Sequence, residues 1–129
     1  MSKYNFKDIA GSELYSATFT KEATLPINAH NRRVDVSGWT LEIDAFPSLS
    51  LLLHWFDGCW NVTEVTSGFR VASADTRRAA IRSAIWAIAR KGIDNVEARI
   101  TSAIDRNGLA KDLPLKATES AQPLEEVQS

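Results

Sequence analysis

In several stretches before residue 73, hydrophobic and polar residues alternate with the period of two that is typical of β-strands. The alternation is clear over residues 13–20 and 39–45, and it predicts two strands that each bury one face. Residues 24–33 between them contain Pro26, two asparagines and two arginines, and this composition predicts a loop.

Asp57-Gly58 separates two apolar runs, residues 49–56 and 59–65, and predicts a β-hairpin. A two-residue type I′ turn needs positive φ at both central positions, which Asp-Gly tolerates. Counting back from the turn places Trp55 opposite Trp60 and gives the hairpin one core face and one outer face. The core face carries Leu49, Leu51, Leu53, Trp55, Trp60 and Val62, and the outer face carries Leu52, His54, Phe56, Cys59, Asn61 and Thr63. Ser67-Gly68 predicts a second tight turn, followed by a short strand over residues 69–72.

After residue 73 the apolar spacing becomes helical. Ser73 or Asp75 is the expected cap of a helix that continues to Lys91 and ends at Gly92. Its expected buried stripe consists of Ile81, Ala84, Ile85, Ile88 and Ala89. A second helix begins with Asp94-Asn95-Val96-Glu97, stops at Asn107-Gly108, and is expected to bury Val96, Ile100, Ala103 and Ile104.

These elements predict an α+β fold with a four- or five-stranded antiparallel sheet and two C-terminal helices packed on one face. Residues 1–108 are expected to form a single domain, and residues 109–129, rich in Lys, Ser, Thr, Pro, Gln and Glu, a mobile tail.

Composition favours a cytoplasmic protein, either a monomer or a homodimer. The 129 residues contain no apolar run near the roughly 20 residues of a membrane span, and the first residues lack the apolar stretch of a signal peptide. Cys59 is the single cysteine, so no internal disulfide is expected.

The formal net charge of −1 conceals a strong asymmetry along the chain. Residues 34–69 contain five acidic residues and no lysine or arginine, whereas residues 70–92 contain six basic residues and one acidic residue. The two segments either neutralise each other within the fold or present one acidic and one basic face to a charged partner.

His54 and Cys59 are the residues that suggest reaction chemistry, because both lie on the outer face of the hairpin. A Cys/His hydrolase or transferase is one hypothesis, since an imidazole can activate a thiolate. No oxyanion-binding glycine loop accompanies the pair, and two side chains are fewer than the three or four ligands that zinc requires. We therefore expect no enzyme activity, no metal and no cofactor.

Two surfaces are candidates for binding a partner. On the helix over residues 75–91, Arg82, Trp86 and Arg90 fall on one stripe, and arginine with an aromatic ring suits either a protein interface or nucleic acid. On the outer sheet face, Glu42 and Asp44 accompany an apolar patch, which is typical of a protein interface. The predicted partner-binding residues are Glu42, Asp44, Leu52, His54, Phe56, Arg78, Arg82, Trp86 and Arg90. A small nucleic-acid-binding protein that uses the basic helix, with Arg77 included, is the alternative function.

One part of the chain resembles the strand-turn-strand-helix unit of small accessory proteins encoded by phages and prophages. The resemblance rests on Trp60-Asn61-Val62, on Thr66-Ser67-Gly68-Phe69-Arg70-Val71, and on Thr76-Arg77-Arg78 followed by Ala80-Ile81. In size and in its lack of a catalytic motif the chain is similar to phage inhibitors of host defence, anti-CRISPR proteins among them. The resemblance covers about a third of the chain and implies a protein-interaction module that binds a host nucleoprotein complex.

Overall fold

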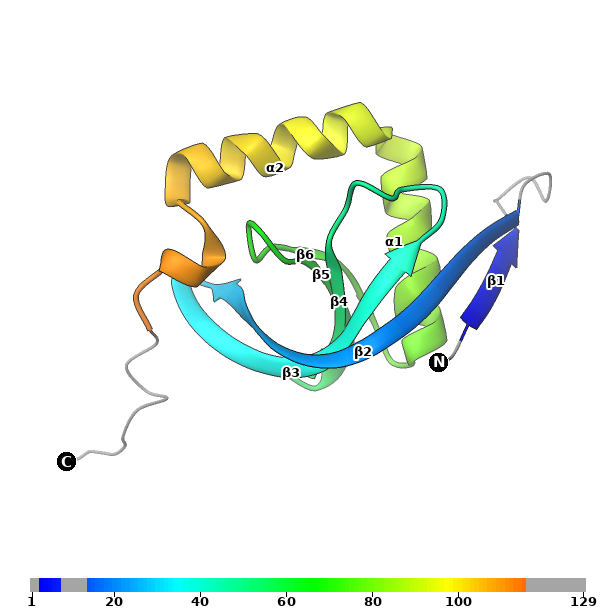
Figure 1. The fold of residues 1–129 in the computed structure, drawn as a ribbon, viewed down its shortest axis with the longest axis horizontal. Helices are drawn as coiled ribbons and strands as arrows, with labels where there is room; N and C mark the ends of the chain where they lie inside the picture. Colours follow the sequence, from blue (N-terminus) through cyan, green and yellow to red (C-terminus); the bar gives the residue numbers. More distant parts are fainter. Residues whose placement is uncertain (1–2, 8–13, 116–129) are drawn as a thin grey trace.

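The computed structural model describes residues 3–7 and 14–115, which form a strongly curved antiparallel sheet followed by two helices (Figure 1). In chain order the elements are β1 (Lys3–Lys7), β2 (Leu14–Ala29), β3 (Arg32–Ile43), β4 (Leu51–Phe56), β5 (Cys59–Glu64), β6 (Arg70–Ala74), α1 (Arg77–Lys91), α2 (Ile93–Asn107) and the 3-10 helix η1 (Ala110–Asp112). Among these residues, no helix is long and apolar enough to cross a membrane.

The predicted fold class is confirmed, but the predicted number of strands was too low. Within the described residues the sheet has six strands, arranged in sequence order so that each pairs with the next. The strand without a counterpart in the prediction is β1, which pairs with the first residues of β2. Figure 1 shows the sheet bending into a half-barrel, with β2 and β3 as its long curved wall.

The Asp-Gly hairpin has the predicted register. Asp57 and Gly58 have φ values of 55° and 82°, and Phe56 pairs with Cys59 across the turn. The indole rings of Trp55 and Trp60 meet edge to face, 5.6 Å between centroids. Trp55 was wrongly assigned to the core, because 53% of its surface is exposed at the end of the sheet.

The loop predicted over residues 24–33 was wrong, since β2 and β3 run through this stretch as a second hairpin. His30 and Asn31 have φ values of 56° and 64°, so they form the two-residue turn. Pro26 is tolerated because β1 pairs with β2 only from Leu14 to Thr18 among the described residues. Beyond that point β2 is an edge strand, where a proline removes no ladder hydrogen bond.

The main core lies between the sheet and α1. Ala84 and the three isoleucines of α1 are buried as predicted, whereas Ala89 is exposed. The helix packs on one sheet face, on side chains that include Leu41, Ile43, Leu51, Leu53 and Val62.

A second core covers the opposite face of the sheet. A β-bulge between Phe19 and Glu22 changes the register of β2, so later side chains of β2 point to the other face. Ile27, together with Val34 and Val36 of β3, then packs against Leu52. The outer face of the central hairpin, where Leu52, His54 and Phe56 were predicted to bind a partner, is instead covered by the curved β2–β3 hairpin.

The two helices do not pack equally on the sheet. Thr76 caps α1, its side chain accepting a hydrogen bond from the Ala79 amide, so the predicted caps at Ser73 and Asp75 were one to three residues early. Of the four residues that α2 was expected to bury, only Ala103 is buried. Figure 1 shows α2 leaving α1 at a sharp angle and spanning the distance to η1.

Residues 109–115 belong to the fold rather than to the tail that was predicted from residue 109. Ala110 is fully buried, and its amide donates to the Thr66 carbonyl at 2.9 Å. The Arg33 amide donates to the Pro114 carbonyl at 2.7 Å, which ties the same segment to the β2–β3 hairpin. Residues 116–129 of the predicted tail lie outside the described residues.

Candidate binding cleft

Two of the side chains predicted on the sheet surface, Glu42 and Asp44, are exposed at the end of β3 and just beyond it. Asp44 also fixes the chain locally, because its Oδ1 accepts a hydrogen bond from the Ser16 amide at 2.8 Å. The Asp44 amide in turn donates to the Ser16 carbonyl at 2.9 Å. Glu42 is therefore the freer of the two carboxylates.

The other three predicted sheet-face residues belong to the second core. Leu52 and His54 are 0% and 1% exposed, and Phe56 is half-buried. The Nε2 atom of His54 lies 2.7 Å from Thr63 Oγ1. Burial lowers the pKa of His54 from 6.5 to about 4, and a hydrogen bond involving the Trp55 backbone opposes part of that change. Leu52 and the neutral His54 ring stabilise the fold and offer no surface to a partner.

The hypothetical Cys/His nucleophile is not assembled. Cys59 Sγ is directed at the Phe56 carbonyl at 3.7 Å and at Asn61 Oδ1 at 3.9 Å, while the His54 ring contacts Thr63. Activation of a thiol requires a base within hydrogen-bond reach. In the described part of the chain, no group of three or more His, Cys, Asp or Glu residues could hold a metal ion.

On α1 the predicted arginines are used mainly to hold aromatic rings. The Arg82 guanidinium lies 4.2 Å from the centroid of Trp86, which is half-buried against the main core. Arg78 lies over Phe6 of β1 at 4.7 Å, and Arg90 is exposed. The structure thus brings Arg82 and Trp86 together as predicted, in a cation–π contact that the fold itself uses.

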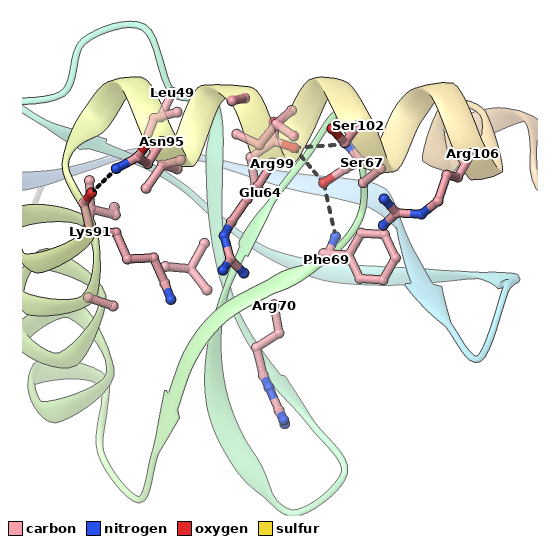
Figure 2. A pocket seen from close by; sticks show the side chains of 17 residues that line it. Leu49, Glu64, Ser67, Phe69, Arg70, Lys91, Asn95, Arg99, Ser102 and Arg106 are labelled. Carbon is pink, nitrogen blue, oxygen red and sulfur yellow. Dashed lines mark hydrogen bonds between the residues drawn. The ribbon is translucent and has the colours of Figure 1, made fainter.

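A cleft of about 910 Å³ lies between α2 and the β6 side of the sheet, where the sequence analysis placed no site. Four cationic side chains line it: Arg70 of β6, Lys91 at the end of α1, and Arg99 and Arg106 of α2. Figure 2 shows Lys91 and Arg99 extending into the space beneath α2 and Arg106 beside the ring of Phe69. Arg70 extends from β6 on the side away from α2.

The cationic cleft keeps a net positive charge within the described part of the fold, because Glu64 is the single carboxylate residue among its lining residues. All four cationic side chains are exposed, and the ion pair found among the described residues joins Arg33 to Asp35 elsewhere. The acidic residues of α2 do not line the cleft. Glu97, for example, accepts a hydrogen bond from Ser48 at 2.6 Å on another side of the helix.

Glu64 is the carboxylate in the wall of the cationic cleft, and its oxygens are fully occupied. Oε1 accepts from the amide and hydroxyl of Ser67 at 2.9 and 2.7 Å, and Oε2 accepts from the amide and hydroxyl of Thr66 at 3.0 and 2.6 Å. Only 4% of Glu64 is exposed. Four hydrogen bonds at one carboxylate fix the turn that carries Phe69 into the wall of the cleft.

The interior of the cationic cleft is apolar. Val96 and Ile100 of α2 face it and are only half-buried, and Val71 and Ile88 contribute from β6 and α1. Phe69 is 39% exposed at the same place. Helix α2 therefore presents an apolar stripe that the described residues cover incompletely.

Part of the cationic cleft is visible in the sequence. Arg99 and Arg106 are seven residues apart, so they lie on one face of α2, beside the stripe of Val96, Ile100 and Ala103. The predicted basic segment, residues 70–92, already contained the other two cations. What sequence could not supply is the distance between α2 and β6, which depends on tertiary packing.

Comparison with known proteins gives no family model, no curated protein and no solved structure that matches this chain.

Proposed function

We propose that this protein is a non-enzymatic, cytoplasmic binding protein whose cationic cleft receives an acidic segment of a partner protein. The observation that carries the proposal is the combination of four exposed cations, unpaired among the described residues, with an apolar interior. A segment with both carboxylates and apolar side chains complements both properties.

The two properties contribute differently to binding. Charge complementarity raises the association rate and rejects partners of the wrong sign. Affinity comes mainly from desolvated apolar and aromatic contacts near the centre of an interface. Phe69 and Ile100 are the side chains best placed to make such contacts.

The resemblance to phage-encoded inhibitors suggests a biological setting. In that setting the partner is a protein component of a host defence nucleoprotein, and binding in the cleft blocks that component. The chain then acts stoichiometrically, without turnover.

Nucleic acid is the competing ligand for a cationic surface. Against it, the α1 arginines on which that hypothesis relied are engaged with rings: Arg77 lies 5.5 Å from Trp60, and Arg82 and Arg78 cover Trp86 and Phe6. Base stacking also requires exposed aromatic faces, and the cleft contributes Phe69 alone among its lining residues.

A peptide selection tests the proposal directly. The full-length protein is immobilised and used to select binders from a random dodecapeptide library, and the affinity of each selected peptide is measured by fluorescence anisotropy. We expect the selected sequences to be enriched in Asp and Glu together with apolar residues. A single-stranded thymidine oligonucleotide is titrated in parallel.

Charge reversal then locates the site. Arg99→Glu should weaken peptide binding at least about tenfold, or about 1.4 kcal/mol, because a cation that faces the acidic ligand becomes an anion. Lys21→Glu makes the same change of net charge at an exposed position of β2 that does not line the cleft, and should leave affinity nearly unchanged. Equal effects of the two variants, selected peptides without acidic enrichment, or tighter binding of the oligonucleotide would each contradict the proposal.

A further inference from the structure

Strand β6 is an edge of the sheet next to the cationic cleft. In the order of described strands it is the last, so it pairs with β5 on one side and with no described strand on the other. Its residues Arg70 and Val71 line the cleft. A segment that enters the cleft therefore meets the free edge of β6.

The backbone hydrogen bonds at the end of β5 define which backbone groups of β6 face this edge. The Val65 amide donates to Ser50 on the β4 side, and the Glu64 amide donates to Phe69 on the β6 side, each at 2.9 Å. In an antiparallel ladder the direction alternates with each residue, so Asn61, like Val65, directs its backbone groups toward β4.

Ser73 is the residue opposite Asn61 in the β5–β6 register. It therefore sits in a non-hydrogen-bonded pair, and its amide and carbonyl point away from β5. Ser73 is also exposed. An unpaired amide and carbonyl at an exposed edge are the groups that an incoming strand uses.

We infer that the acidic partner segment binds in extended form, as an additional strand paired with β6. This inference rests on the proposed function and specifies its geometry. Main-chain hydrogen bonds to Ser73 supply alignment, and alternate side chains of the segment point toward α2 and away from it. Those on the α2 side meet Val71, Ile88 and the cations Lys91 and Arg99, while those on the other side pass Arg70.

Charge complementarity favours an acidic segment of a partner protein as the occupant of the cleft. That segment could bind either as a helix or as a strand, and the two differ in the spacing of their contacts. A helical ligand would place its anchors at intervals of three and four residues, whereas an added strand places them at every second residue. The spacing of acidic and apolar residues in the selected peptides therefore distinguishes the two. We expect an alternation with a period of two.

The decisive variant is Ser73→Pro, with Ser73→Ala as its matched control. Proline is compatible with an edge strand when the lost amide faced outward, but it cannot donate to an added strand. Ser73→Pro should bind the selected peptides at least about tenfold more weakly than Ser73→Ala. Both variants should show the circular dichroism spectrum of the unaltered protein.

A second measurement covers the case in which Ser73→Pro does not fold. The best peptide is synthesised with N-methyl groups on its odd-numbered amides, and separately on its even-numbered amides, and both forms are titrated against the unaltered protein. Strand addition predicts that one set abolishes binding and the other leaves it nearly intact. Equal effects of the two sets would overturn strand addition.

Failure of this inference is distinguishable from failure of the proposed function. If Arg99→Glu weakens binding but Ser73→Pro binds as Ser73→Ala does, the acidic ligand occupies the cleft without pairing to β6. If Arg99→Glu leaves binding unchanged, the cleft is not the site and both proposals fall.

Discussion

Acidification should destabilise this protein through His54 before most carboxylates are protonated. The imidazole is 1% exposed, and burial lowers its pKa from 6.5 to about 4. Between these two values the unfolded chain binds a proton at His54 and the folded chain does not. The free energy of unfolding therefore falls as the pH is lowered through this window.

The size of the effect follows from the two pKa values. A tenfold change in proton affinity corresponds to about 1.4 kcal/mol, so lowering the pKa from 6.5 to about 4 costs ~3 kcal/mol of stability once the pH is below both values. At about pH 5 the loss is already ~2 kcal/mol. Against a typical total of roughly 5–15 kcal/mol, this is a measurable fraction.

The measurement is urea denaturation followed by tryptophan fluorescence at about pH 7.5 and about pH 5, for the unaltered protein and for His54→Gln. Glutamine stays neutral and retains a group that can hydrogen-bond Thr63. The unaltered protein should lose ~2 kcal/mol more than the variant between the two pH values. Equal losses would refute the reasoning, as would an NMR titration of the His54 ring with a pKa near 6.5.

Four further substitutions test the packing of the fold. Gly38→Ala should lower the free energy of unfolding, measured by urea denaturation, by about 3 kcal/mol or more. The added Cβ would collide with the Leu53 carbonyl and lie 2.8 Å from His54 Cβ. A change below about 1 kcal/mol would show that β3 and β4 can separate. Glu64→Gln should lower the free energy of unfolding by about 2 kcal/mol, since the amide NH2 would face donors that now bind a carboxylate oxygen. An unchanged melting temperature would contradict the role of Glu64 in fixing this turn. Trp55→Ala should lower the free energy of unfolding by only about 1 kcal/mol, because its side chain is half exposed, whereas Leu53→Ala should lower it by roughly 2–5 kcal/mol. The reverse order would mean that the core is assigned to the wrong face of the sheet.

Local chemistry explains which parts of the fold were predictable. The hairpin at Asp57-Gly58 follows from two residues that tolerate positive φ, and its register follows from the turn. The isoleucine stripe of α1 is likewise a property of one segment. By contrast, Pro26 led to the prediction of a loop where β2 continues as a strand. Whether a strand tolerates proline depends on which strands lie beside it, and sequence does not show this.

The errors at the candidate site have a different physical cause. Leu52 and His54 were predicted to bind a partner because a sequence does not reveal that the bulge after Phe19 turns β2 across that face. The cationic cleft was missed for a related reason. Its cations come from β6, α1 and α2, and their proximity is decided by packing rather than by spacing along the chain.

The most direct test of the central claim is a map of where an acidic peptide binds. The best selected peptide is titrated into the isotopically labelled full-length protein, and the changes in backbone amide chemical shift are followed by NMR. Binding of the peptide as a strand beside β6 predicts the largest changes in residues 67–71 and 95–106, which include most of the residues that line the cationic cleft, and in Ser73 at the free edge of β6. Changes concentrated instead on the exposed Trp55 hairpin or on the N-terminal half of α1 would contradict it.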